Sequence, residues 1–106
     1  MRTTKNGIVY DTDTSTLIAA LAMWKGSPDE IRMELYRTRF HRFNRFFVVE
    51  YHARRKPTWE WPDSEQAEQL FKRWEAARPY FDKRLYFELD KRLDFDDVAF
   101  EDALED

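Results

Sequence analysis

The chain has 106 residues and no cysteine, so disulfide bonds and thiolate chemistry are excluded, and its length predicts one domain spanning residues 1–106. Its two glycines are too few for a glycine-rich phosphate loop, and no apolar run approaches the ~20 residues of a membrane span. The absence of cysteine fits a reducing compartment, so we expect a soluble, cytoplasmic protein with a formal net charge of −3.

The N-terminal region predicts one strand, followed by an ambiguous segment. Residues 8–10, Ile-Val-Tyr, follow an Asn-Gly pair and indicate a short strand. The Asp- and Thr-rich residues 11–14 indicate a turn in which Asp side chains bond backbone amides. Leu17, Leu21 and Trp24 have helical spacing, but a second strand pairing with the first fits this segment equally well.

The strongest local pattern predicts an antiparallel hairpin over residues 36–51. One register gathers the apolar and aromatic side chains of both strands on a single face, pairing Tyr36 with Tyr51, Thr38 with Val49, and Phe40 with Phe47. The same register sets Arg37 opposite Glu50 on a second, basic face. Residues 42–45 are left as the turn, with Asn44 in the left-handed conformation.

The next segment predicts a helix that starts at a capping motif. Residues 59–62 are expected to be extended, with Trp59 and Trp61 on one side as core anchors. Asp63 and Gln66 then have the spacing of a capping box. Five apolar residues behind them form one helical stripe, namely Ala67, Leu70, Phe71, Trp74 and Ala77.

The C-terminal third predicts further helix. Apolar residues recur every four positions from Phe81 to Leu93, which favours a second helix, although residues 85–89 also fit a strand. The acidic segment, residues 94–106, keeps apolar residues at roughly helical spacing. We therefore expect an α+β fold, in which an antiparallel sheet of about four strands has one or two C-terminal helices packed on its apolar face.

Charge is segregated along the chain. Residues 32–56 carry eight basic and two acidic side chains, whereas residues 94–106 carry seven acidic side chains and no basic one. Opposed charge blocks of this kind favour contact with a charged macromolecule. The sequence thus indicates a binding protein.

Signals for catalysis or metal binding are weak. The two histidines, His41 and His52, have no nearby catalytic pattern and are expected on the surface, and no Cys/His set has zinc spacing. Residues 11–15 begin like a calcium loop, but Thr16 and Ala22 stand where an EF-hand needs Gly and Glu. We expect no enzymatic activity, no cofactor and no metal.

Several segments resemble a family of small uncharacterised proteins from bacterial mobile elements and phages. Residues 6–14, 34–38 and 44–47 are similar to its patterns G-x-x-Y-D-T-x-T, E-x-L-Y-R-T/K and G-x-F-F, and residues 62–67 resemble its helix start. Asn44 departs from the family's Gly, and the C-terminal region is longer and more acidic. The resemblance implies a small sheet with packed helices and a mobile-element origin, and it carries no catalytic residue.

Two functions follow as expectations. The first is a non-enzymatic inhibitor, anti-CRISPR-like by analogy, that blocks a host protein or nucleoprotein complex through an acidic surface formed by Asp94, Asp96, Asp97, Glu101 and Asp102. The alternative is a small nucleic-acid-binding regulator that uses an Arg/aromatic hairpin with Arg37, Arg39, Arg42, Arg45 and Arg54. Either protein would be a monomer or a homodimer, since an exposed sheet edge can pair across a dimer.

Overall fold

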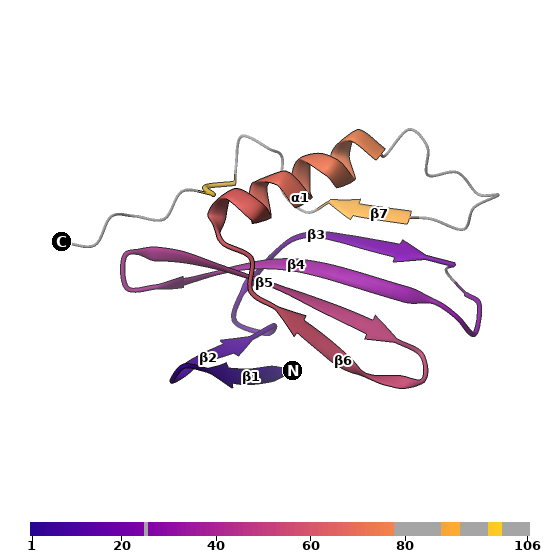
Figure 1. The fold of residues 1–106 in the computed structure, drawn as a ribbon, viewed down its shortest axis with the longest axis horizontal. Coiled ribbons are helices and arrows are strands. Elements are labelled where there is room, and N and C mark those ends of the chain that lie inside the picture. The colour runs from indigo at the N-terminus through magenta and orange to yellow at the C-terminus, as the bar shows by residue number, and fades with distance from the viewer. Residues whose placement is uncertain (25, 78–87, 92–97, 101–106) are drawn as a thin grey trace.

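The computed structural model describes residues 1–24, 26–77, 88–91 and 98–100. Its main element is a five-stranded antiparallel sheet in the order β6-β5-β4-β3-β7, made of β3 (Thr16–Met23), β4 (Ile31–Phe40), β5 (Phe43–His52), β6 (Arg55–Glu60) and β7 (Glu88–Lys91) (Figure 1). A two-stranded ribbon, β1 (Arg2–Lys5) and β2 (Ile8–Asp11), precedes it, and helix α1 (Ser64–Ala77) follows β6. The predicted α+β class is confirmed.

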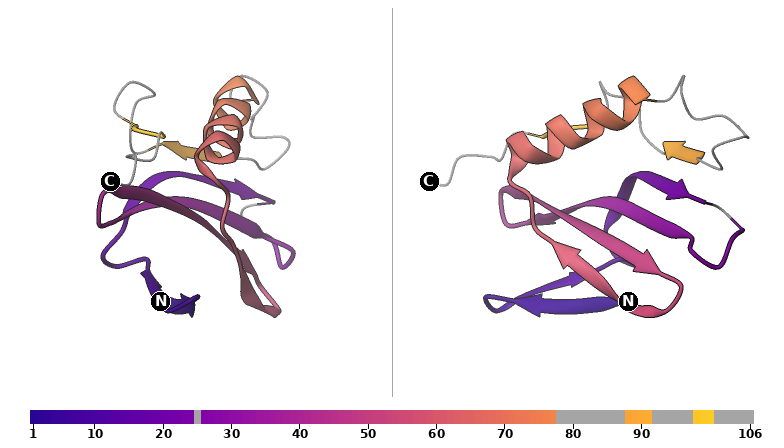
Figure 2. Two further views of the ribbon diagram at one scale, coloured as in Figure 1. Left: turned by 60° about the vertical axis from the view of Figure 1, so that its left-hand side comes forward. Right: turned by 45° about the vertical axis from the view of Figure 1, so that its right-hand side comes forward.

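The five-stranded sheet is apolar on both faces. Figure 2 shows it lying between α1 and the β1–β2 ribbon. On the helix-side face, Leu35, Phe46 and Val48 are buried against the helix, whose inward residues are Ala67, Phe71 and Trp74. On the other face, which we call the aromatic face, the buried core consists of Tyr10, Tyr36, Phe47 and Val49, with the half-buried Trp59 and Trp61 packed against it. The helix therefore covers the face that the sequence predicted to be basic.

The predicted hairpin exists, but its register was wrong by four residues. Tyr36 lies opposite Phe47 rather than Tyr51, and Arg37 lies opposite Phe46 rather than Glu50. The turn is shortened to two residues, with His41 at a φ of 55°. An even shift keeps every side chain on its original face, so the two-residue alternation alone fits both registers equally well.

Two more expectations about the strands are corrected. The segment at residues 16–24 is a strand, as one alternative had it, but β3 pairs with β4 and β7 and not with the first strand. The strand predicted at residues 8–10 is β2. It pairs with β1, a strand that the polar sequence of residues 2–5 did not predict. Asn6 and Gly7 connect β1 and β2 with positive φ angles of 52° and 79°, as a tight hairpin turn requires.

Helix α1 begins as predicted. The Gln66 amide donates to Asp63 Oδ1 at 2.7 Å, and the Asp63 amide donates to Gln66 Oε1 at 3.0 Å, so the two residues cap each other. Ala67, Phe71 and Trp74 of the predicted stripe are buried. Within the described residues, no helix has both the length and the apolar character needed to span a membrane.

The C-terminal predictions are only partly covered by the described residues. Leu89 lies in β7, so the strand alternative is confirmed at residues 88–89, and a helix continuing through them was wrong. Residues 90–91 also belong to β7, whereas residues 81–87 and 92–93 lie outside the described part. Val98 and Phe100 are buried in the helix-side core, and Phe100 stacks on Phe46 with ring centroids 5.5 Å apart.

Asn44 connects this C-terminal stretch to β5. Its side chain is only 6% exposed, and its Nδ2 donates to the Ala99 carbonyl at 3.1 Å. The substitution Asn44→Ala should lower the free energy of unfolding by about 1 kcal/mol, because the part-buried hydrogen bond to the Ala99 carbonyl is lost. Urea denaturation checks this, with the exposed Gln69→Ala as a control expected to stay within about 0.5 kcal/mol of wild type. A loss at Asn44 no larger than that of the control would contradict the role of this hydrogen bond.

Candidate binding surface

The distal end of the β4–β5 hairpin, residues 37–46, holds four of the five arginines of the predicted nucleic-acid site and no acidic residue. We call it the arginine end. It extends past its neighbours, because β3 pairs with β4 only as far as Arg37, and β6 pairs with β5 only from Val48 onward. Arg37 and Arg39 lie on the helix-side face, Arg42 is in the turn, and Arg45 is on the aromatic face.

Arg54, the fifth predicted residue, does not belong to this surface. It lies in the turn between β5 and β6, at the opposite end of the ten-residue strand β5. At about 3.3 Å per residue, the two ends of this strand are about 30 Å apart. The five predicted arginines therefore lie on two separate surfaces. Four are at the arginine end, and Arg54 is at the other end of β5 beside Arg55 and Lys56.

Aromatic rings accompany the charges at the arginine end. Phe40 is 39% exposed, and its ring centroid lies 4.4 Å from that of His41. The Arg45 guanidinium lies 5.4 Å from the centroid of the Phe43 ring, within cation–π range. The Nε atom of Arg45 is buried and has no hydrogen-bond partner within the part of the chain that the structure describes. Cations and flat rings thus share one projecting surface.

A polar pocket of about 380 Å³ opens on the helix-side face of this end. It is lined by Thr14, Thr16, Arg37, Thr38, Arg39, Asn44 and Ala99, and none of these residues is acidic. Arg39 Nη1 donates to Asn44 Oδ1 at 3.4 Å. The corrected register leaves Glu50 away from Arg37, and Glu50 instead lies 3.5 Å from His52 and accepts a hydrogen bond from Thr58 at 3.4 Å.

The acidic candidates Asp94, Asp96, Asp97, Glu101 and Asp102 lie outside the described residues. The described stretch 98–100 between them is fixed to the fold, because Val98 and Phe100 are buried and the Ala99 carbonyl accepts from Asn44. Ala99 is therefore held next to Asn44 of the arginine end.

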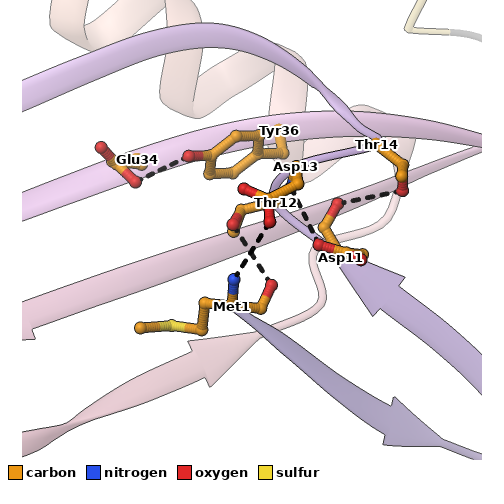
Figure 3. A network of polar contacts seen from close by, with 7 residues as sticks. All are labelled: Met1, Asp11, Thr12, Asp13, Thr14, Glu34 and Tyr36. Carbon is orange, nitrogen blue, oxygen red and sulfur yellow. Dashed lines mark hydrogen bonds and ion pairs between the residues drawn. The ribbon is translucent and has the colours of Figure 1, made fainter.

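A second polar cluster lies on the aromatic face and was not predicted. Glu34 accepts a hydrogen bond from the Tyr36 hydroxyl at 2.7 Å (Figure 3). It accepts another from Arg32 Nε at 2.8 Å. The only sequence signal is the alternation of Arg32, Glu34 and Tyr36 along one side of a strand. Figure 3 also shows the turn at residues 11–14, where the Asp11 side chain accepts from the Asp13 amide at 2.9 Å, as predicted.

The cluster predicts alkaline sensitivity. Burial, followed by a hydrogen bond to Glu34 and its negative charge, raises the pKa of Tyr36 well above its ordinary value. Burial and then the charge of Glu34 raise the pKa of Tyr51 to about 12. Because the unfolded tyrosines lose their protons near pH 10, this stabilisation is complete below pH 10 and is lost as the pH rises toward 12. Urea denaturation between pH 8 and pH 11.5 should show stability falling above pH 10, with a shallower fall in the Tyr36→Phe/Tyr51→Phe double variant. Equal slopes would contradict this role.

In the described part of the chain, no group of three or more His, Asp or Glu side chains is placed to hold a metal ion. Comparison of the chain with protein-family models, with curated proteins and with solved structures finds no match. The family resemblance therefore remains a prediction.

Proposed function

We propose that the chain is a non-enzymatic, cytoplasmic binding protein that holds single-stranded nucleic acid at the arginine end of the β4–β5 hairpin. The observation that carries this proposal is a projecting surface with four arginines, an exposed Phe40 and no acidic residue between positions 37 and 46. Phosphate contacts from arginine supply affinity without requiring a particular base sequence.

Single strands suit this surface better than a duplex. Phe40 and His41 at the tip offer rings on which unpaired bases can stack, and a duplex keeps those base faces covered. Arg42 lies in the same turn, and in this proposal it contacts the phosphates between stacked bases. The overall charge of −3 opposes binding and salt screens this repulsion, so a fall of affinity with salt would come from the local phosphate contacts of the arginines.

The test is the affinity of the protein for a fluorescein-labelled 20-nucleotide single strand, measured by anisotropy over a series of salt concentrations. Three to four phosphate contacts on a single strand predict a slope of log K against log salt of about −2 to −3. Blunt duplex DNA of the same sequence is the comparison ligand and should bind more weakly. A flat salt response, or a preference for the duplex, would exclude this mode of binding.

A second candidate is the expected inhibitor of a host nucleoprotein complex, in which the acidic segment masks a surface that normally grips nucleic acid. The buried Val98 and Phe100 favour it, because they fix the chain between Asp97 and Glu101 to the core. A carboxylate-rich segment attached to a rigid sheet loses less conformational freedom on binding than a free tail would.

One variant separates the two candidates. Neutralising Asp96→Asn, Asp97→Asn, Glu101→Gln and Asp102→Asn together removes four of the seven negative charges of the acidic segment. Nucleic-acid binding at the arginine end predicts a higher affinity for the single strand in this variant, because a repulsive field is removed. Inhibition through the acidic segment predicts instead that a nuclease-resistant protein partner, captured from bacterial lysate by the wild type, is lost.

A further inference from the structure

The polar pocket beside the arginine end has a definite arrangement. Thr16 of β3 lies directly opposite Arg37 of β4, and Asn44 of β5 lies directly opposite Arg39, so all four residues are on the helix-side face. The next residue pair along this face, Leu35 and Ala19, is fully buried in the core. The pocket thus lies where the apolar layer under α1 ends and a row of hydrogen-bond donors begins.

The charge of this pocket is unbalanced. Arg37 and Arg39 bring two guanidinium groups, and none of the described lining residues is acidic. The Arg37 side chain forms no hydrogen bond or ion pair within the described residues, and the Arg39 side chain has only the 3.4 Å contact with Asn44. Guanidinium groups bind the oxygens of phosphate in pairs, and two of them match a doubly charged ligand.

The number of charges distinguishes between kinds of phosphate. A phosphate monoester carries about 1.5 to 2 negative charges at pH 7 and has three terminal oxygens, whereas a phosphodiester within a strand carries one charge and two free oxygens. A monoester also ends the chain that carries it, so it can enter a recess that a continuous strand passes over. The volume of about 380 Å³ leaves room for the attached sugar.

We propose that this pocket binds a phosphate monoester, with Arg37 and Arg39 holding its oxygens and the Thr16 hydroxyl donating a further hydrogen bond. The source is either the phosphorylated end of a strand or a free mononucleotide. The first source rests on the proposed function, because the pocket then binds the phosphorylated end of a strand whose bases stack at the arginine end. The second source is independent of it.

The experiment compares three labelled 12-nucleotide strands of one sequence, ending in a 5′-phosphate, a 3′-phosphate or two hydroxyls. Deoxyadenosine monophosphate and deoxyadenosine serve as the free probes. At least one phosphorylated strand should bind about tenfold more tightly than the hydroxyl-ended strand, as expected for one charge-assisted contact set. Arg37→Gln and Thr16→Val should abolish or reduce this difference, and Thr16→Val should leave the binding of the hydroxyl-ended strand unchanged. Arg54→Gln, at the far end of β5, should preserve the difference.

The outcomes distinguish the pocket from the proposed function. If all strands bind equally well with the expected salt slope, the pocket assignment is wrong and nucleic-acid binding stands. If the monophosphate binds and no strand does, the pocket assignment stands and the proposed function is wrong. If the tenfold difference appears only in the acid-neutralised variant, the chain's own carboxylates occupy the pocket and the assignment is overturned. Thermal melting of Arg37→Gln and Thr16→Val establishes that both variants are folded, and Thr16→Val keeps the charge of the pocket unchanged.

Discussion

Replacing Arg39, Arg42 and Arg45 together by glutamine is expected to lower the affinity for single-stranded nucleic acid by about hundredfold at low salt. Exposed phosphate contacts of about 1 kcal/mol each add up to about 3 kcal/mol, and 1.4 kcal/mol is a factor of ten. The slope of log K against log salt should also become shallower by about 2, because three counterion-releasing contacts are removed at about 0.7 each. Fluorescence anisotropy over a salt series measures both quantities.

The chain provides a matched control for this variant. Arg54, Arg55 and Lys56 follow the other end of β5, and replacing all three by glutamine changes the net charge by the same amount. This control should stay within about threefold of wild type, since only the long-range field is altered. Equal losses in the two triple variants would mean that the arginine end is not a site and that overall charge governs binding.

Phe47→Ala should have the largest effect on stability, lowering the free energy of unfolding by about 3–5 kcal/mol. Phe47 is fully buried and joins three parts of the aromatic face, with ring centroids 5.1 Å from Tyr36, 5.5 Å from Tyr10 and 5.5 Å from Trp59. Losing the ring leaves a cavity at the centre of this cluster and removes the main apolar contact between β2 and the sheet. The free energy of unfolding of a whole domain is only about 5–15 kcal/mol, so the midpoint temperature of thermal unfolding should fall strongly.

Phe40→Ala is the counterpart on the surface. Its ring is 39% exposed at the hairpin tip, so the free energy of unfolding should change by about 0.5 kcal/mol or less. Affinity for single strands should nevertheless fall, since one base–aromatic stack is worth about 1–3 kcal/mol. Urea denaturation and anisotropy on the same two proteins give the comparison. Similar stability losses in both variants would contradict the burial pattern, and unchanged affinity in Phe40→Ala would remove the tip from the binding surface.

The parts of the fold that sequence predicted correctly depend on local signals. The capping residues Asp63 and Gln66 and the stripe of Ala67, Phe71 and Trp74 specify helix α1 within one segment. The hairpin register depends instead on which of several even shifts is chosen, and alternation of side chains is identical in all of them. The two-residue turn at His41 decides between them, and a histidine with positive φ has no distinctive sequence signature.

The residue types of the candidate site could be predicted from the sequence, but their arrangement in space could not. The density of arginine identified residues 37–45, but Arg54 was grouped with them because nearness in sequence was taken for nearness in space. The pocket requires Thr16 opposite Arg37, and that pairing depends on a register irregularity between Leu17 and Ala19 in β3. The contact of Asn44 with Ala99 joins positions 55 residues apart, which no local pattern encodes.

An NMR titration can locate the surface that holds nucleic acid, which we propose is the arginine end. Backbone amide and arginine Nε–Hε signals of the labelled protein would be followed as an unlabelled 12-nucleotide single strand is added. We expect saturable shifts concentrated in residues 37–46, including the side chains of Arg42 and Arg45, with the turn at Arg54 unaffected. Shifts concentrated at that turn or on α1, or no saturable shifts at low salt, would contradict it.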